Sequence, residues 1–133
     1  MDYGLDTSAL MRILTLQPQP LAFKVVARVA EIVETGVILH VSDLAVFEAY
    51  YALQHSYAAE KGNAISYLLA LSRQLGFRFS DNAVSALSKP NAATMSPGMV
   101  DCMIAGEYSA HGLRVLACEK DFRRFPNAEV VTE

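Results

Sequence analysis

Short apolar runs alternate with longer segments of helical periodicity along the chain. Apolar residues three and four apart indicate helices, and short β-branched runs such as Val37 to Val41 indicate buried strands. The predicted strands are Tyr3 to Asp6, Val37 to Val41, Phe77 to Phe79, Leu113 to Ala117 and Val130 to Val131, and the predicted helices are Thr7 to Leu16, Leu21 to Glu34, Ser42 or Asp43 to His55, Glu60 to Leu75, Asp81 to Leu87 and Pro97 to His111. Strands separated by helices predict an α/β fold with a mainly parallel sheet.

Turn and capping residues set the limits of these elements. Pro18 and Pro20 prevent continuation of the first helix, and Gly36 is suited to end the second. Ser96 followed by Pro97 predicts an N-cap with proline at the first helical position. The chain has 133 residues and no internal repeat or linker, so the sequence predicts a single domain over residues 1–133.

The segment from Ser42 to His55 is apolar on nearly every side of a helix. Its large apolar residues are Leu44, Val46, Phe47, Tyr50, Tyr51 and Leu53, and the preceding helix adds Phe23, Val26 and Val29. One side of such a helix can face the sheet. We expect the other side to form a homodimer surface, a groove for a partner segment, or both. The alternative is a helix buried between two layers.

Composition and charge restrict the classes of function. The formal net charge is -3, with 53% hydrophobic and 19% charged residues. This balance excludes a globally basic nucleic-acid binder, so contacts with nucleic acid must come from a local basic patch. The apolar excess favours a surface buried against a partner. We expect a cytoplasmic protein without a signal peptide or membrane-spanning helix, in which Cys102 and Cys118 are reduced core thiols.

Four acidic residues stand in unusually apolar surroundings: Asp6, Glu48, Asp101 and Glu119. A lone ionised carboxylate in such a setting costs several kcal/mol unless it is paired or binds a metal. Each also has an ordinary explanation. Asp6 is suited to N-cap the next helix, Glu119 to lie in a solvated turn, and the other two to reach solvent from a helix edge. If all four converge, their combined charge requires a cation.

Four motifs in order along the chain carry a resemblance to a known family. They are Leu5-Asp6-Thr7-Ser8-Ala9-Leu10, Val41-Ser42-Asp43-Leu44-Ala45-Val46-Phe47-Glu48, Asp101-Cys102-Met103-Ile104-Ala105 and Leu116-Ala117-Cys118-Glu119-Lys120-Asp121-Phe122. Each is weak alone, but together they cover nearly the whole chain and resemble the PIN-domain family. The size of the chain suggests the VapC-type toxins of toxin–antitoxin pairs.

The resemblance implies a three-layer fold with four to five strands in its central, mainly parallel sheet. It also implies an endoribonuclease, cytoplasmic and restrained by an antitoxin, that leaves 5′-phosphate and 3′-hydroxyl ends. Asp6, Glu48 and Asp101 would bind Mg²⁺ or Mn²⁺, ions that prefer carboxylate oxygens. The hydroxyls of Thr7 and Ser8 would support the site.

The fourth motif departs from the family pattern. Ala117 stands where the family has Thr or Ser, and Glu119 where it has Asp or Asn. Asp121 is a nearby substitute for the fourth acid. The departure keeps open an alternative function, a catalytically weakened PIN-like module that binds RNA or protein. Phosphate contacts need nearby cations, and the candidates for RNA contact are Arg12, Lys120, Arg123 and Arg124.

Overall fold

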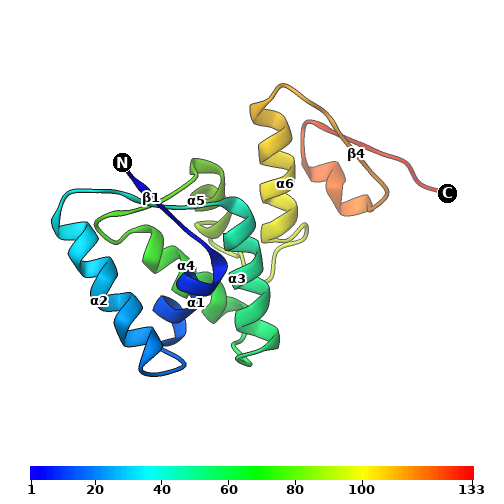
Figure 1. Cartoon of the computed structure of the whole chain (residues 1–133). Coiled ribbons are helices and arrows are strands. Elements are labelled where there is room, and N and C mark those ends of the chain that lie inside the picture. Colours follow the sequence, from blue (N-terminus) through cyan, green and yellow to red (C-terminus); the bar gives the residue numbers. More distant parts are fainter.

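The computed structural model describes all 133 residues and contains two separate parallel sheets (Figure 1). In chain order, the elements are β1 (Tyr3–Leu5), α1 (Thr7–Thr15), α2 (Leu21–Glu34), β2 (Leu39–Val41), α3 (Asp43–His55), α4 (Lys61–Ser72), β3 (Phe77–Phe79), α5 (Asp81–Leu87), α6 (Met99–Ala110), β4 (Val115–Ala117), the 3-10 helix η1 (Lys120–Arg124) and β5 (Ala128–Val130). The predicted alternation of strands and helices, and with it the α/β class, is confirmed.

The first sheet, in the order β1-β2-β3, is packed on one face only. Successive side chains of a strand point to opposite faces. The core-facing side chains are Leu39, Val41 and Phe79. The row across the other face is exposed on all three strands, at Gly4, His40 and Arg78. Helices therefore cover one face of this sheet, and the other face is open where a three-layer fold would cover it.

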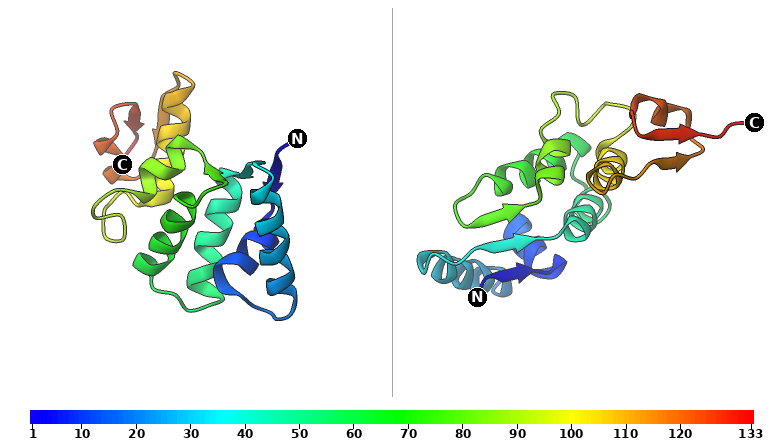
Figure 2. Two further views of the ribbon diagram at one scale, coloured as in Figure 1. Left: turned by 90° about the vertical axis from the view of Figure 1, so that its left-hand side faces the viewer. Right: turned by 90° about the horizontal axis from the view of Figure 1, so that it is seen from above.

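The second sheet consists of β4 and β5 alone. It lies beside α6 at one end of the molecule, away from β1 (Figures 1 and 2). Val115 of β4, Ala105 of α6 and Phe122 of η1 form a small core of their own. The predicted sheet of four to five strands is thus divided into three strands and two.

The main core lies under the first sheet. α1 packs against α2 and α3, α3 packs against α4, and α4 packs against both β3 and α5. The large side chains that are fully buried are Leu10, Leu39, Val46, Leu68, Leu87 and Met99. α3 buries Val46, Tyr50 and Leu53 but exposes Leu44 and Phe47. The helix that is apolar on nearly every side therefore has one face in the core and one in solvent.

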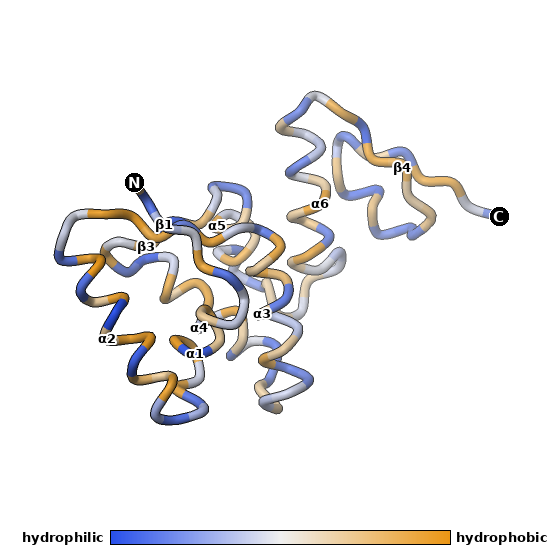
Figure 3. Tube along the Cα trace, viewed as in Figure 1, coloured by the Kyte–Doolittle hydropathy of each residue, from blue (hydrophilic) through white to orange (hydrophobic).

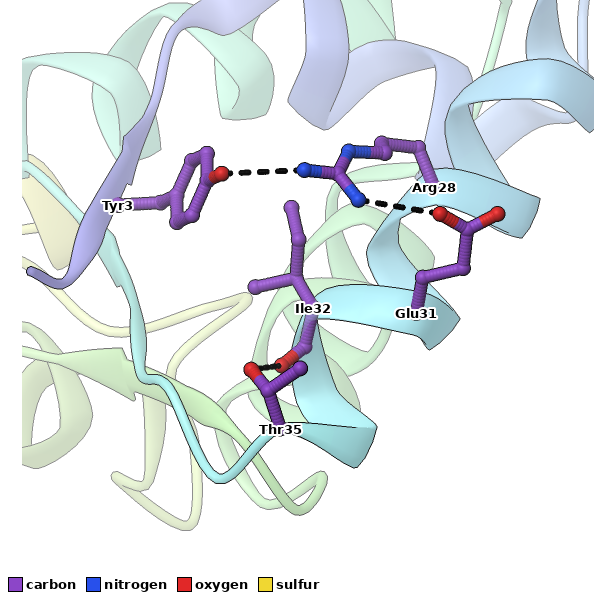
Figure 4. A network of polar contacts seen from close by, with 5 residues as sticks. All are labelled: Tyr3, Arg28, Glu31, Ile32 and Thr35. Atoms are coloured by element: carbon purple, nitrogen blue, oxygen red, sulfur yellow. Dashed lines mark hydrogen bonds and ion pairs between the residues drawn. The ribbon is translucent and has the colours of Figure 1, made fainter.

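A polar network ties α2 to the first strand (Figure 4). Arg28 of α2 donates one hydrogen bond to the hydroxyl of Tyr3 at 3.1 Å and another to Glu31 at 3.0 Å. At the end of the same helix, the hydroxyl of Thr35 donates to the carbonyl of Ile32 at 2.6 Å. The network is exposed, so it orients α2 along β1 more than it stabilises the fold.

The contact between α5 and α6 is unusually close. Asn82 of α5 donates a side-chain hydrogen bond to the carbonyl of Met103 in α6 at 2.7 Å. A Cβ atom on Gly106 would collide with Oδ1 of the same Asn82 side chain. Glycine at this position therefore permits the approach, and the amide of Asn82 fixes it.

We expect Gly106→Ala to lower the free energy of unfolding by about 1–2 kcal/mol, because the added methyl group displaces Asn82 and leaves the Met103 carbonyl without its donor. Urea denaturation measures the change. Gly62→Ala is the matched control, since a Cβ at Gly62 in α4 meets only Ala93 at 3.6 Å. That control should be at least as stable as the wild type, because alanine loses less conformational freedom in a helix than glycine does. Equal stability of the two variants would contradict the close-packing explanation.

Two sequence predictions near the end of the chain are wrong. The last long helix begins at Met99 with Gly98 as its N-cap, not at Ser96 and Pro97. The Ser96 hydroxyl instead donates to Asp121 at 2.7 Å, so it is not available as a cap. Of the two free thiols, Cys102 is half-buried and Cys118 is exposed, so Cys118 is not a core residue. No helix of the structure is both long and apolar enough to cross a membrane.

Candidate metal centre

Asp6 follows β1 and is the N-cap of α1. Its Oδ1 accepts hydrogen bonds from the backbone N–H of Ala9 at 2.9 Å and from the hydroxyl of Ser8 at 2.8 Å. These bonds, the Ala9 N–H first, lower the pKa of Asp6. The capping function expected of this residue is therefore present, and the carboxylate stays ionised and exposed at the end of the strand.

Glu48 projects from the exposed face of α3 toward the start of α1. Its Oε1 accepts a hydrogen bond of 3.0 Å from the hydroxyl of Thr7. Thr7 directly follows Asp6, so this bond links the second acid to the residue beside the first. Asp6, Thr7, Ser8 and Glu48 form one polar group, which we call the β1 group.

Three further acids meet at the base of α6. One ligand oxygen from each of Asp101, Glu119 and Asp121 lies within 4.8 Å of the others. Asp101 lies in the first turn of α6, Glu119 precedes η1, and Asp121 lies in the first turn of η1. We call these three residues the α6 cluster. Both acids that the sequence offered for the fourth position therefore belong to it.

The α6 cluster has the features of a cation site. Asp121 Oδ2 accepts the hydrogen bond of Ser96, but its Oδ1 is buried with no hydrogen-bond partner. A buried carboxylate oxygen without a donor is costly, and a bound cation would satisfy it. An all-oxygen set of this size suits Mg²⁺ or Mn²⁺, which keep several waters and need few protein ligands.

Burial, and after it the charge of Asp121, raises the pKa of Asp101. The folded, metal-free protein therefore keeps a proton on Asp101 at pH values where the unfolded chain has released it. We expect its stability to fall as pH rises from the unfolded value of about 3.9 through the raised folded pKa. Asp101→Asn should remove this fall in urea denaturation with chelator present.

Asp6→Asn is the control for this pH dependence, because the pKa of Asp6 shifts the other way. Wild type should gain stability over Asp6→Asn as pH rises past the lowered folded pKa and up to the unfolded value. If the stability of the wild type relative to the variant changed in the same direction with pH for Asp101→Asn and Asp6→Asn, the environments assigned to the two acids would be wrong.

The β1 group and the α6 cluster are separate in this structure. Asp6, Glu48 and Asp101, the predicted ligand set, do not form a group with ligand atoms within 4.8 Å. In Figures 1 and 2, α3 lies between the end of β1 and α6 in every view. Sequence reasoning missed Ser96 as a partner of the acids, because a Ser-Pro pair before a helix also fits an ordinary cap.

The basic candidates divide between two regions. Lys120, Arg123 and Arg124 are exposed on η1, next to Asp121. Arg12, in the last turn of α1, instead donates to the hydroxyl of Tyr57 at 3.0 Å. The cations nearest in sequence to the α6 cluster are therefore those of η1.

A model of the PIN domain family matches residues 3–128, which is nearly the whole chain. The chain belongs to the PIN-domain family. PIN domains are generally nucleases and typically depend on a divalent metal. The resemblance of the chain to this family is thereby confirmed.

No curated protein matches the chain in sequence. Among solved structures, the chain is similar to the crystal structure of VapBC2 from Rickettsia felis bound to a DNA fragment from their promoter. The two share 17% sequence identity with a TM-score of 0.44, over 100% of this chain and 99% of that chain. Family membership rests on the match over residues 3–128.

Proposed function

We propose that this PIN domain is a metal-dependent endoribonuclease of the VapC type, the toxin of a toxin–antitoxin pair. The observation that carries the proposal is the α6 cluster, where three acids converge and a buried oxygen of Asp121 lacks a partner. A cation would satisfy such a cluster, and PIN domains are generally nucleases. The four motifs and the size of the chain support the VapC type.

Different residues of this chain would bind the metal and orient its ligands in the proposed reaction. Asp101, Asp121 and Glu119 would hold the metal. Asp6 and Glu48 belong to the separate β1 group and would join them only in an assembly that brings the two groups together. The metal, Mg²⁺ or Mn²⁺, supplies a water of lowered pKa and offsets charge on the scissile phosphate when bound. Thr7 and Ser8 keep the carboxylates of Glu48 and Asp6 oriented through their hydrogen bonds.

Exposed cations on η1 are suited to bind the RNA backbone. Lys120, Arg123 and Arg124 contribute three positive charges beside an acidic cluster that would otherwise repel phosphate. Phosphate contacts of this kind position a nucleic acid without reading its sequence and weaken as salt rises. RNA binding by this chain should therefore fall steeply with ionic strength.

The test of the proposed function is cleavage of total RNA by the purified chain, with mapping of the new ends. Mg²⁺ or Mn²⁺ should be required, and the products should carry 5′-phosphate and 3′-hydroxyl ends. RNA that stays intact while the protein binds metal and RNA would favour the weakened binding module instead. Ends bearing 2′,3′-cyclic phosphate would contradict a metal-activated water, because that product forms by attack of the ribose hydroxyl.

The proposed partner is an antitoxin segment in the groove between α3 and α6. This groove, of about 400 Å³, is lined by Asp43, Leu44, Phe47, Val100, Met103, Ile104 and Glu107. Its apolar floor suits an amphipathic helix or extended peptide, and the two acids suit basic side chains on that segment. Such a segment would lie between the β1 group and the α6 cluster and could block both.

We expect Phe47→Glu to retain RNA cleavage but to escape inhibition by the cognate antitoxin of the proposed pair. A charge placed in the apolar floor disrupts docking, and Phe47 is exposed enough to be replaced without loss of the fold. Tyr67→Glu is the control, since Tyr67 is an exposed aromatic residue on α4, outside the groove. Equal inhibition of both variants would mean that the antitoxin does not dock in this groove. Tyr50 is unsuitable for this test because it is buried.

A further inference from the structure

Each of the two sheets has two unpaired edges, and β1 and β4 each provide one of them. β1 is the end strand of the first sheet, and β4 pairs only with β5. An unpaired edge exposes backbone N–H and C=O groups that readily pair with another chain. The side chains at these edges are also apolar and exposed, with Tyr3 at 43% and Leu116 at 71%. Figure 3 colours β4 as hydrophobic although it lies at the periphery.

The backbone fixes which residues face outward. Tyr3 N–H donates to Ile38 O across to β2, so its neighbour Gly4 directs its backbone groups to the free edge. On β4, Val115 N–H donates to Asn127 O, and Ala117 O accepts from Val131, so Leu116 faces outward. Parallel pairing with Gly4 opposite Ala117 would join Gly4 N–H to Leu116 O.

That register has two consequences. It sets Asp6 opposite Glu119, because each residue lies two positions beyond the paired one. It also puts the side chain of Ala117 on the open face of the first sheet, with those of His40 and Arg78, because Gly4 is paired with His40. Ala117 packs toward the small core that contains Ala105 of α6, so α6 would approach the open face of the first sheet. The free edge of β1 is then paired, α6 covers the open face, and the β1 group lies beside the α6 cluster.

The chain's own β4 is held away from its own β1. α6 is fixed on α5 by the Asn82 bond to Met103 and the close approach at Gly106. The second sheet is fixed on α6 in turn, because Asn127 donates to Ala105 O at 3.2 Å and to Leu113 O at 3.3 Å. Closing the sheet within one chain would require α6 to leave α5.

We propose that a second copy of this chain supplies the missing strand. β4 of each copy pairs with β1 of the other, which gives a two-fold dimer in which both edges are used twice. Each metal centre then combines the β1 group of one copy with the α6 cluster of the other. The assignment of these acids to a metal rests on the proposed function, whereas the strand pairing does not.

Cross-linking tests the pairing without reference to activity. In the proposed register, Tyr3 lies opposite Leu116, and both side chains are exposed. Tyr3→Cys with Leu116→Cys, in a Cys102→Ser and Cys118→Ser background, should give dimers with a short bis-maleimide. Tyr3→Cys with Leu113→Cys, also exposed, is the out-of-register control and should not. A cross-link within one chain, or none, would overturn the proposal.

Complementation tests the shared site. Asp6→Asn and Asp101→Asn chains, each inactive alone, are co-expressed with different tags. A mixed dimer contains one centre with both wild-type residues, so random pairing should restore about a quarter of wild-type cleavage. If the wild type cleaves RNA but the co-expressed variants do not, the shared centre is ruled out. Two variants whose sites each lie within one chain cannot restore each other's activity. An inactive wild type would instead count against the proposed function, and the cross-link would still decide the pairing.

Discussion

Asp101→Asn should reduce RNA cleavage by at least about 100-fold while leaving the fold intact, because a metal ligand is lost and the shape of the side chain is kept. Asp6→Asn should have an effect of similar size. Rates on a defined RNA at saturating Mn²⁺ measure both. Asp81→Asn is the matched control, since Asp81 is an exposed acid on α5 outside both acidic groups. It should cleave at the wild-type rate.

The same assay ranks the two acids of the fourth motif. Asp121 is half-buried, accepts the Ser96 bond and has an unpartnered oxygen, whereas Glu119 is exposed. Asp121→Asn should therefore reduce the rate more than Glu119→Gln. A larger loss for Glu119→Gln would make Glu119 the fourth acid despite its exposure. Full activity of Asp101→Asn would mean that cleavage does not depend on a metal held by this carboxylate.

Metal should stabilise the fold strongly. Binding to the folded state alone adds roughly 2.7 kcal/mol when free metal exceeds its Kd 100-fold. For a chain of this size, the melting temperature should rise on the order of 10 °C. Thermal melting in chelator, then in rising Mn²⁺ or Mg²⁺, measures the shift.

The metal-free baseline supplies the control for the melting experiment. Asp101→Asn should melt above wild type in chelator at neutral pH, because it removes a carboxylate disfavoured by burial and by Asp121. It should then gain little from metal. A shift in Asp101→Asn equal to that of the wild type would mean that the metal binds elsewhere.

Local sequence signals predicted the elements well. The helix Leu21–Glu34, the strand Phe77–Phe79 and the short helix Asp81–Leu87 have the expected limits. The Ser42 cap of α3 is present, with its hydroxyl accepting from Ala45 N–H at 3.1 Å. These features depend on neighbours within a few residues, which periodicity and capping rules describe.

Long-range arrangement was not predictable in the same way. The packing of α6 on α5 includes a close contact between Asn82 and Gly106, which no periodicity reveals. Of the apolar neighbours of Asp101 at helical spacing, Ala105 is buried, whereas Ile104 and Tyr108 are exposed. Helical spacing identifies residues that share a face but not what covers that face.

The acids themselves were identifiable because carboxylates are rare in apolar segments, but their grouping was not. Asp101 joins Glu119 and Asp121, and Glu48 joins Thr7. Grouping of this kind depends on how α6 and η1 are oriented. One chain brings only part of the predicted set together.

The most direct test of the account is a parallel Mn²⁺ titration of RNA cleavage and thermal stability by the wild-type chain. We expect cleavage to be absent in chelator and to become half-maximal near the Mn²⁺ concentration at which the melting temperature begins to rise, because one bound ion causes both. Asp101→Asn should show neither response. Cleavage that persists in chelator, or that saturates without any change in melting temperature, would contradict a metal-dependent ribonuclease built on these acids.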